Sequence, residues 1–318
     1  MGLKVLKYDI IIPHKNDPKR LQRCLDSIPL RDDLKIIVVD DNSDPSIVDF
    51  AHFPGKERHD LEVIFDKVGG GAGHARNIAL RHATADKIIN ADCDDFFTYC
   101  FNDVLDEYKN DDADVVFLNV CSIMEGTYLH SNRCAYKNKL IAGYLYVNPE
   151  KYDLLLRYDE GSPCSKIIKK SLLDKHGIEF EEVPIHDDVK FSYLTGHYAQ
   201  EIKVDERAIY CISETKTSIS FTLNEEKYLT RMHVIGERDR FVQNLGLNLD
   251  CTGKFLVRTL VEIYERGNHE LYERCLSILR DYDFDPKKMH AEVLKAIKAR
   301  KCNECRAKIK KYIHKILG

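Results

Sequence analysis

At 318 residues, the chain is long enough to bury a large core and to hold one large domain or two smaller ones. Hydrophobic residues make up 44% of the sequence and charged residues 31%, which is typical of a globular enzyme and excludes a disordered chain. The net charge is only −4, but the segment 287–318 holds eleven Lys or Arg against two Glu, so a basic tail follows an acidic body.

The first elements alternate between apolar strands and amphipathic helices. Such alternation predicts a parallel α/β sheet with its ligand site at the carboxyl ends of the strands. The first strand, residues 8–13, is almost wholly apolar, as expected of a strand buried on both faces. Further strands are expected over 34–39, 61–65, 87–91 and 115–119, with helices over 18–28, 74–82 and 101–108.

The pattern weakens after residue 121, and only loose strands and loops are expected up to residue 156. From residue 223 onward the apolar positions follow helical periods. We therefore expect a catalytic α/β domain over 1–221 and a helical region over 222–318. The elements expected in between are helices over 166–175 and 189–194 and a strand over 206–212.

The strand at 87–91 ends in three acidic side chains within four positions, Asp92, Asp94 and Asp95. Carboxylates so close together repel one another unless a cation lies among them, and oxygen ligands suit Mg²⁺ or Mn²⁺. Such ions normally bind substrate phosphates as well. The alternative is an acidic turn that caps the next helix, and the triplet alone does not decide between the two.

A glycine run at 69–73 precedes a helix that carries Arg76 near its start. A dinucleotide-binding fingerprint would follow the first strand of its domain, whereas two strand–helix units precede this run, which argues against NAD. An Arg at this helix start can stack on a base or pair with a phosphate. A surface Arg is the alternative.

Taken in order, several sequence blocks resemble the signature of family 2 glycosyltransferases, over roughly residues 8–221. Each block is short, but their order and spacing together are specific. They are IIIPHKN at 10–16, VVDDNS at 38–43, GHARN at 73–77, DCDD at 92–95, KII at 166–168, FEE at 180–182, HDDVKF at 186–191, and a final block from Tyr210 through SIS at 218–220.

The resemblance implies a GT-A fold, which is a Rossmann-like, mostly parallel sheet flanked by helices, here followed by a C-terminal helical region. It implies transfer of a sugar from a nucleotide-diphosphate donor to a hydroxyl. By position in the blocks, Pro13 and Asn16 lie beside the nucleoside. Asp41 hydrogen-bonds the base, and Arg76 contacts the nucleotide.

In the same comparison, Asp92 takes the first position of the family's DxD motif, near the ribose and the metal. Asp94 is then the direct ligand of a Mn²⁺ or Mg²⁺ cofactor, and Asp95 supports that ligand shell or the donor sugar. Asp188 falls on the catalytic base, and Asp187 replaces the glutamate that the family usually carries. The alternative is that both residues are simply acids favoured by a helix N-terminus.

The expected activity is therefore a metal-dependent, inverting transfer from a nucleotide-sugar, by family habit a UDP-sugar, to the hydroxyl of a glycan or lipid-linked glycan in cell-surface polysaccharide synthesis. An inactive sugar-nucleotide-binding protein and a nucleotidyltransferase are the alternatives. Nucleic-acid binding is not expected, because the catalytic half lacks a basic stripe with interleaved aromatics. His186 either contacts acceptor or diphosphate, or is a local hydrogen-bonding partner.

Eleven cysteines without regular spacing predict reduced thiols, and we expect a cytoplasmic protein without a secretory signal. The CxxC pair Cys302 and Cys305 has no second pair nearby, which argues against zinc. An apolar stripe that includes Val293, Leu294 and Ile297 runs through the basic tail. Residues 287–318 therefore either lie on the inner face of the membrane, making the protein peripheral, or pack on the catalytic domain.

Overall fold

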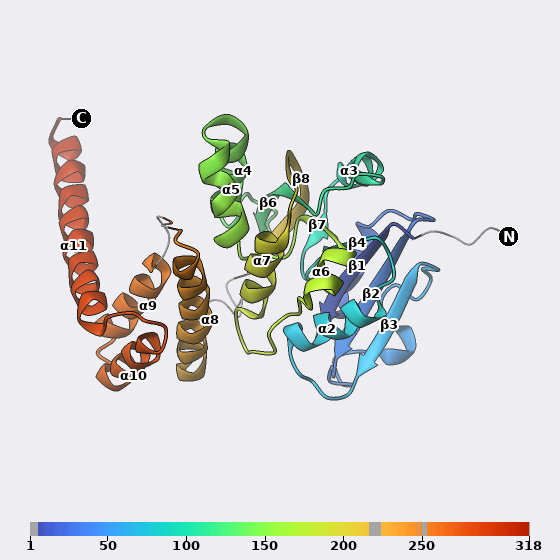
Figure 1. Cartoon of the computed structure of the whole chain (residues 1–318), viewed down its shortest axis with the longest axis horizontal. Coiled ribbons are helices and arrows are strands. Elements are labelled where there is room, and N and C mark those ends of the chain that lie inside the picture. Colours follow the sequence, from blue (N-terminus) through green and yellow to red (C-terminus); the bar gives the residue numbers. More distant parts are fainter. Residues whose placement is uncertain (1–5, 216–223, 248, 250–252, 318) are drawn as a thin grey trace. The chain divides into compact units, whose positions relative to one another are not determined.

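The computed structural model describes residues 6–215, 224–247, 249 and 253–317, with the backbone alone from residue 303. The chain divides into two compact units, Met1–Thr222 and Leu223–Gly318. The first unit is an eight-stranded mixed sheet flanked by helices, and the second consists of helices in its described part (Figure 1).

The sheet has the strand order β3-β2-β1-β4-β7-β6-β8-β5. Its first four strands are all parallel, so their carboxyl ends meet at one edge. The other half is mixed, because β7 runs antiparallel to both of its neighbours, β4 and β6. The strands are β1 (Tyr8–His14), β2 (Leu34–Asp41), β3 (Leu61–Asp66), β4 (Lys87–Asn90), β5 (Phe96–Phe97), β6 (Val115–Met124), β7 (Lys166–Lys169) and β8 (Ile202–Glu214).

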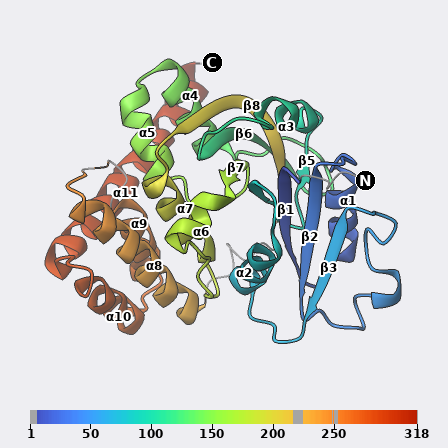
Figure 2. The same ribbon diagram turned by 45° about the vertical axis from the view of Figure 1, so that its right-hand side comes forward.

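Helices cover both faces of this sheet. Ile10 and Ile12 of β1 belong to one apolar cluster with residues of α1 and α3, and alternation along the strand directs Ile11 to the opposite face. Helix α2 packs against β1 and β2, and it lies to the left of β1 in Figure 2. The helices are α1 (Pro18–Asp26), η1 (Phe50–His52, a 3₁₀ turn), α2 (Ala72–His82), α3 (Phe101–Tyr108), α4 (Ala135–Tyr146), α5 (Pro149–Tyr158), α6 (Lys170–His176) and α7 (Asp187–Tyr198).

Two regions differ from the sequence prediction. Residues 166–175 do not form one helix, because Ile167 and Ile168 belong to strand β7, and only the residues after it are helical. Periodicity cannot distinguish so short an apolar run from a buried helical turn. Residues 121–156 contain two helices, α4 and α5, where loose strands and loops were expected. Helix α4 has weak amphipathic character, so its sequence gives little helical signal.

The second unit begins with a helix capped by Asn224, whose side chain accepts from the Lys227 amide. Asn268 caps a later helix in the same way. Among the described residues of the chain, no helix combines the length and the apolarity needed to cross a membrane. The helices of this unit are α8 (Glu225–Asn244), α9 (Lys254–Glu265), α10 (His269–Arg280) and α11 (Pro286–Leu317).

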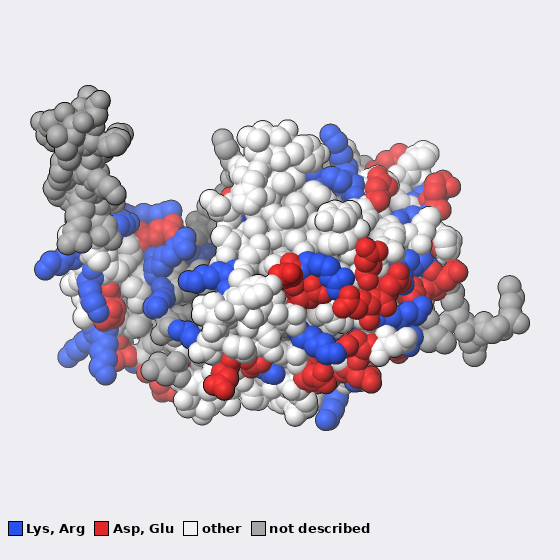
Figure 3. Space-filling view, turned by 90° about the horizontal axis from the view of Figure 1, so that it is seen from above, with Lys and Arg blue, Asp and Glu red and all other residues white. Residues whose placement is uncertain are grey.

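The charges are unevenly distributed over the surface. Asp and Glu gather over the first unit in Figure 3, whereas Lys and Arg are prominent over the second. The side chains of the predicted tail stripe beyond residue 302, and that of Cys305, lie outside the described residues. The block 218–220 and the expected boundary at 221 also lie outside them.

Candidate active site

The acidic triplet follows β4 at the edge where the parallel strands end. Oxygens of Asp92, Asp94 and Asp95 lie within 4.8 Å of one another, and in the described part of the chain this is the one group of three residues placed to hold a metal ion. The turn is tight, since the Asp95 amide donates to the Asp92 carbonyl at 3.2 Å. The triplet therefore converges on one point instead of spreading into solvent.

Strand β8 positions two of these three aspartates. The Asp92 amide donates to the Tyr210 hydroxyl at 2.7 Å, and the Ser213 amide donates to the Asp95 carboxylate at 2.7 Å. Asp95 is only 4% exposed. Burial, together with the charges of Asp92 and Asp94, raises the pKa of Asp95 well above its usual range, although hydrogen bonds from Ser213 and Tyr210 oppose this.

Asp94 presents its carboxylate toward the open side of the cluster. Its side chain is 41% exposed, and the Arg20 guanidinium lies 3.3 Å away. Arg23 holds the Asp94 carbonyl at 2.5 Å. Desolvation and the charge of Asp92 raise the pKa of Asp94 to about 6. Three carboxylates this close together form a donor set that a hard divalent cation fits, because it neutralises them and prefers oxygen ligands.

Arg76 of α2 connects the triplet to helix α7. One guanidinium nitrogen donates to Asp92 at 2.6 Å, and the other pairs with Asp187. The group is almost fully buried and lies over the Phe180 ring at 5.3 Å. Burial opposes its charge, but Asp92 and Asp187 outweigh burial and keep the pKa of Arg76 raised. The predicted nucleotide contact is thus also a bridge between two acidic clusters.

The rest of the α2 block fastens this helix to the segment before α7. A Cβ on Gly73 would lie 2.0 Å from the Glu181 carbonyl oxygen, so only glycine permits this approach. The Asn77 side chain accepts from the Phe180 amide at 2.8 Å and donates to the Phe180 carbonyl at 3.0 Å. His74 lies 3.0 Å from the Glu182 carboxylate. These contacts explain why the GHARN block contains Gly73, His74 and Asn77, which its sequence alone did not reveal.

Asp187 and Asp188 form the first turn of α7, where the helix dipole favours acidic groups. The chain enters the helix through His186, a non-glycine residue with φ of 61°. Burial, followed by the charge of Asp187, raises the pKa of Asp188 to about 7. Asp187 is held by Arg76, whereas no ion pair to Asp188 is present among the described residues. The two predicted catalytic acids therefore have different environments.

The ends of β1 and β2 carry the predicted nucleoside contacts. Asp41 is buried and accepts from the Gly71 amide and the Lys15 ammonium group, each at 3.0 Å. Asn16 has a φ of 55°, and its side chain accepts from the Asp44 amide at 2.7 Å. Pro13 lies three positions earlier, within β1. The glycine run at 69–73 therefore lies beside Asp41, through the Gly71 amide.

A buried histidine–aspartate pair supports the same edge and was not predicted. His14 lies 2.8 Å from Asp40, and its other ring nitrogen accepts from the Asp17 amide at 3.1 Å. The hydrogen-bonding pattern places the ring proton on Nδ1, which donates to Asp40. Asp40 also accepts from the Ser43 hydroxyl at 2.6 Å. Two consecutive aspartates at the end of β2 were the available signal, but their separate roles depend on the fold.

Residues 9–174 match the model of the family described as Glycosyl transferase family 2. The chain belongs to this family. The match covers the ends of β1 and β2, the α2 block, the acidic triplet and β7.

Similarities to individual proteins agree with this assignment. Over 96 residues the chain is 34% identical to the poly(ribitol-phosphate) beta-glucosyltransferase of Bacillus spizizenii, a match that spans 29% of this chain and 15% of that enzyme. The chain also resembles residues 1–349 of S. aureus TarS, a structure in complex with UDP-GlcNAc. The TM-score is 0.60 at 19% identity, and the match covers 87% of this chain and 80% of the TarS chain.

A third similarity is to the mannosyltransferase PcManGT from Pyrobaculum calidifontis, in complex with GDP-Man and Mn²⁺. It has a TM-score of 0.51 at 16% identity and covers 98% of this chain and 85% of that one. At such identities the likeness concerns the fold. The fold is the α/β GT-A fold that the family 2 resemblance implied.

Proposed function

We propose that this protein is a metal-dependent, inverting glycosyltransferase that takes its sugar from a nucleotide-diphosphate donor. The observation that carries the proposal is the connection from the acidic triplet through Arg76 to the Asp187–Asp188 pair. The acidic triplet is suited to binding a cation, and the Asp187–Asp188 pair is suited to proton transfer. Both lie at the carboxyl edge of parallel strands, where ligands bind in such sheets.

In this proposal the donor nucleoside binds beside Pro13 and Asn16. Asp41 hydrogen-bonds the base, and its contacts with Gly71 and Lys15 hold the carboxylate in position. The preferred base is uracil, the base of the UDP-GlcNAc bound by TarS. Arg76 would orient the carboxylate of Asp92 toward the ribose and the metal.

Asp94 and Asp92 would hold a Mn²⁺ or Mg²⁺ ion. Asp95 would support this ligand shell, through its hydrogen bond with Ser213, or the donor sugar. When bound, such an ion acts as a Lewis acid and offsets the charge that develops on the leaving diphosphate. Mn²⁺ accompanies GDP-Man in PcManGT, which supports a divalent ion in this fold.

Asp188 is the proposed catalytic base. Its raised pKa of about 7 gives it the proton affinity that a base needs near neutral pH. It would remove the proton from the acceptor hydroxyl as that oxygen attacks the anomeric carbon. One base and one displacement invert the configuration at that carbon. Asp187, paired with Arg76, would position the start of α7 instead of accepting the proton.

The proposed acceptor is the hydroxyl of a glycan or a lipid-linked glycan in cell-surface polysaccharide synthesis. The name of the Bacillus spizizenii relative, poly(ribitol-phosphate) beta-glucosyltransferase, suggests one more acceptor to test, a polyol-phosphate chain. A cytoplasmic protein that works at the inner face of the membrane would meet such acceptors. Membrane contact through 287–318 is part of this proposal.

The test measures the nucleoside diphosphate released from UDP-, GDP- and dTDP-sugars with Mn²⁺, with and without acceptors. We expect release from one donor, loss of release in Asp94→Ala, and unchanged release in Asp112→Asn, an exposed acid distant in sequence from the triplet. Pyrophosphate as the product would point to a nucleotidyltransferase. Metal-dependent donor binding without any turnover would point to an inactive sugar-nucleotide-binding protein.

A further inference from the structure

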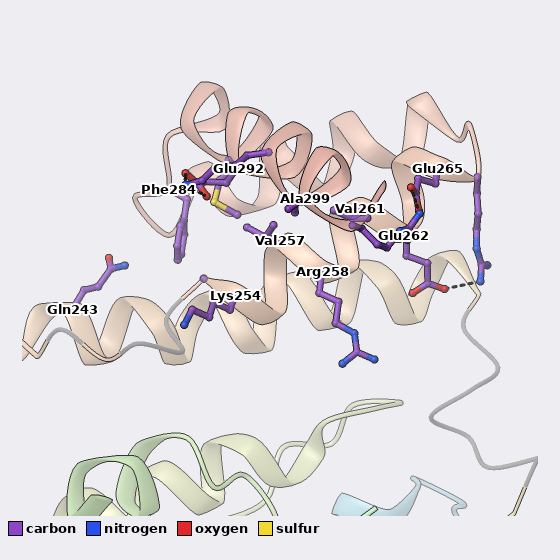
Figure 4. A pocket seen from close by; sticks show the side chains of 16 residues that line it. Gln243, Lys254, Val257, Arg258, Val261, Glu262, Glu265, Phe284, Glu292 and Ala299 are labelled. Carbon is purple, nitrogen blue, oxygen red and sulfur yellow. Dashed lines mark hydrogen bonds and ion pairs between the residues drawn. The ribbon is translucent and has the colours of Figure 1, made fainter. Parts of the chain in front are cut away.

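A large groove lies wholly within the helical unit, between α9 and α11. It has a volume of about 1110 Å³ and reaches Gln243 near the end of α8 (Figure 4). Binding sites for drug-sized ligands range from roughly 300 to 1,000 Å³, so this groove exceeds the usual size. None of the residues proposed for catalysis lines it.

The floor of the groove is apolar. Val257 of α9 and Ala299 of α11 approach each other across it in Figure 4. Small side chains at 296 and 299, one turn apart on α11, leave open the space that larger residues would fill in an ordinary helix contact. Apolar walls gain free energy when an apolar ligand covers them. The apolar lining consists mainly of Val257, Val261, Phe284, Met289, Ala296 and Ala299.

The acidic residues of the rim are all paired with rim cations. Glu262 lies 2.5 Å from Arg266, and Glu292 lies 3.3 Å from Lys295. Glu265 pairs with Arg300. Because each carboxylate already has a cation, none of them is left to neutralise the other basic residues of the rim.

Two further cations on the rim remain, Lys254 and Arg258. They lie one turn apart on α9, both are exposed, and neither has an ion-pair partner among the described residues. In Figure 4 both side chains extend from the edge of α9 that faces away from α11. Like charges at this spacing repel each other, and an anion between them would relieve the repulsion.

We propose that this groove binds the acyl chain of an anionic membrane lipid, with the chain on the apolar floor and the phosphate against Lys254 and Arg258. An apolar floor beside two cations that have no ion-pair partner in the described part of the chain matches an anionic amphiphile. Inorganic phosphate would leave the floor uncovered, and a neutral amphiphile would leave the cations unpaired. The proposal does not depend on the proposed catalytic activity, but it deepens the proposed membrane contact of 287–318, because α11 forms one wall of the groove.

The first experiment is calorimetry of the intact chain with lysophosphatidylglycerol below its micelle concentration. We expect one site per chain and a negative heat-capacity change, the mark of apolar burial. Inorganic phosphate should not bind, and dodecyl maltoside should bind about tenfold more weakly. Equal affinity for the neutral amphiphile, or binding of phosphate alone, would overturn the proposal.

Matched variants locate the site. The double variant Lys254→Glu/Arg258→Glu should bind the lysolipid about tenfold more weakly or worse, since a basic residue near an anionic lipid contributes about one kcal/mol, or roughly fivefold. The control Arg274→Glu/Arg280→Glu reverses two exposed charges on α10 outside the groove. An equal loss in this control would mean general attraction to basic residues, and the groove would be rejected.

Val257→Asp tests the floor, with circular dichroism to establish that the helices form. We expect it to abolish lysolipid binding and to halt co-sedimentation with phosphatidylglycerol vesicles. A second copy of the chain is the competing occupant of such a groove. Absence of lysolipid binding by the unaltered chain, together with a dimer in sedimentation that Val257→Asp dissociates, would reject the lipid in favour of that copy.

Discussion

Arg76 and Asp187 lie 111 positions apart in the sequence, yet they form a partly buried ion pair that ties helix α2 to the first turn of α7. The same guanidinium donates to Asp92. One side chain therefore determines the spacing between the acidic triplet and the predicted base, and this spacing is the feature that substitutions can test most directly.

Replacing Arg76 with Lys keeps the charge but removes the fork that binds two carboxylates at once. We expect kcat/KM for the transferase reaction to fall by about 10²-fold, because a misplacement of around 1 Å has that effect. Steady-state kinetics with the accepted donor measures this, with the exposed Arg81→Lys on the same helix as the control. Unchanged kinetics in Arg76→Lys would contradict the bridging role.

Replacing Asp188 with Asn removes the proposed base while conserving its shape. We expect kcat to fall by about 10²- to 10⁴-fold, the usual contribution of general base catalysis, with donor affinity unchanged. Asp187→Asn should instead weaken the contact with Arg76 and reduce both kcat and stability. If Asp187→Asn alone abolished turnover and Asp188→Asn did not, the roles of the two acids would be exchanged.

The pKa of Asp188, about 7, predicts a pH dependence. The base must be ionised to accept a proton, so kcat/KM should rise with pH through about 7 and then level off. The free energy of unfolding depends on pH in the opposite direction. The folded state keeps the proton from pH 4 to 7 while the unfolded chain releases it, so this group makes folding less favourable as pH rises through that range. Asp188→Asn should therefore gain most stability, relative to the unaltered chain, above pH 7.

Divalent metal should stabilise the protein through the triplet. Mn²⁺ at about 100 times its Kd would contribute about 2.7 kcal/mol to the free energy of unfolding, and chelation would remove it. Without metal, Asp94→Ala should be at least as stable as the unaltered chain, because it relieves repulsion with Asp92. Thermal unfolding measures both effects. A metal-dependent rise of the melting temperature that persists in Asp94→Ala would place the ion elsewhere.

Gly73→Ala should damage the site through packing alone. The new Cβ would lie 2.0 Å from the Glu181 carbonyl oxygen, and such overpacking typically reduces stability by about 1–3 kcal/mol. Activity should fall with it, because α2 and α7 would move apart. Gly161→Ala is the matched control, since its Cβ would meet Val189 at an ordinary 3.7 Å. Denaturant unfolding compares the two variants. Equal stabilities would contradict the close approach of Gly73 to the Glu181 carbonyl oxygen as a requirement for glycine.

Local patterns predicted much of the first unit. Apolar runs identified β1, β2 and β4, since strands buried on both faces require continuous apolar residues, and also the partly exposed edge strand β3. They failed at Lys166–Lys169, because a four-residue strand is defined by pairing with β4 and β6, which lie far away in the sequence. Helix α4 was not predicted, because its sequence is only weakly amphipathic. Which of its residues are buried depends on neighbours that the local pattern does not encode.

The sequence alone predicts which residues are candidates for the chemistry and the order in which they occur, because strand ends and short acidic motifs are local features. Their partners depend on the tertiary structure. It pairs Arg76 with Asp187 instead of Asp188, joins β8 to the triplet through Tyr210 and Ser213, and adds His14 to Asp40. These contacts connect residues that many positions separate, and the folding of the sheet brings them together.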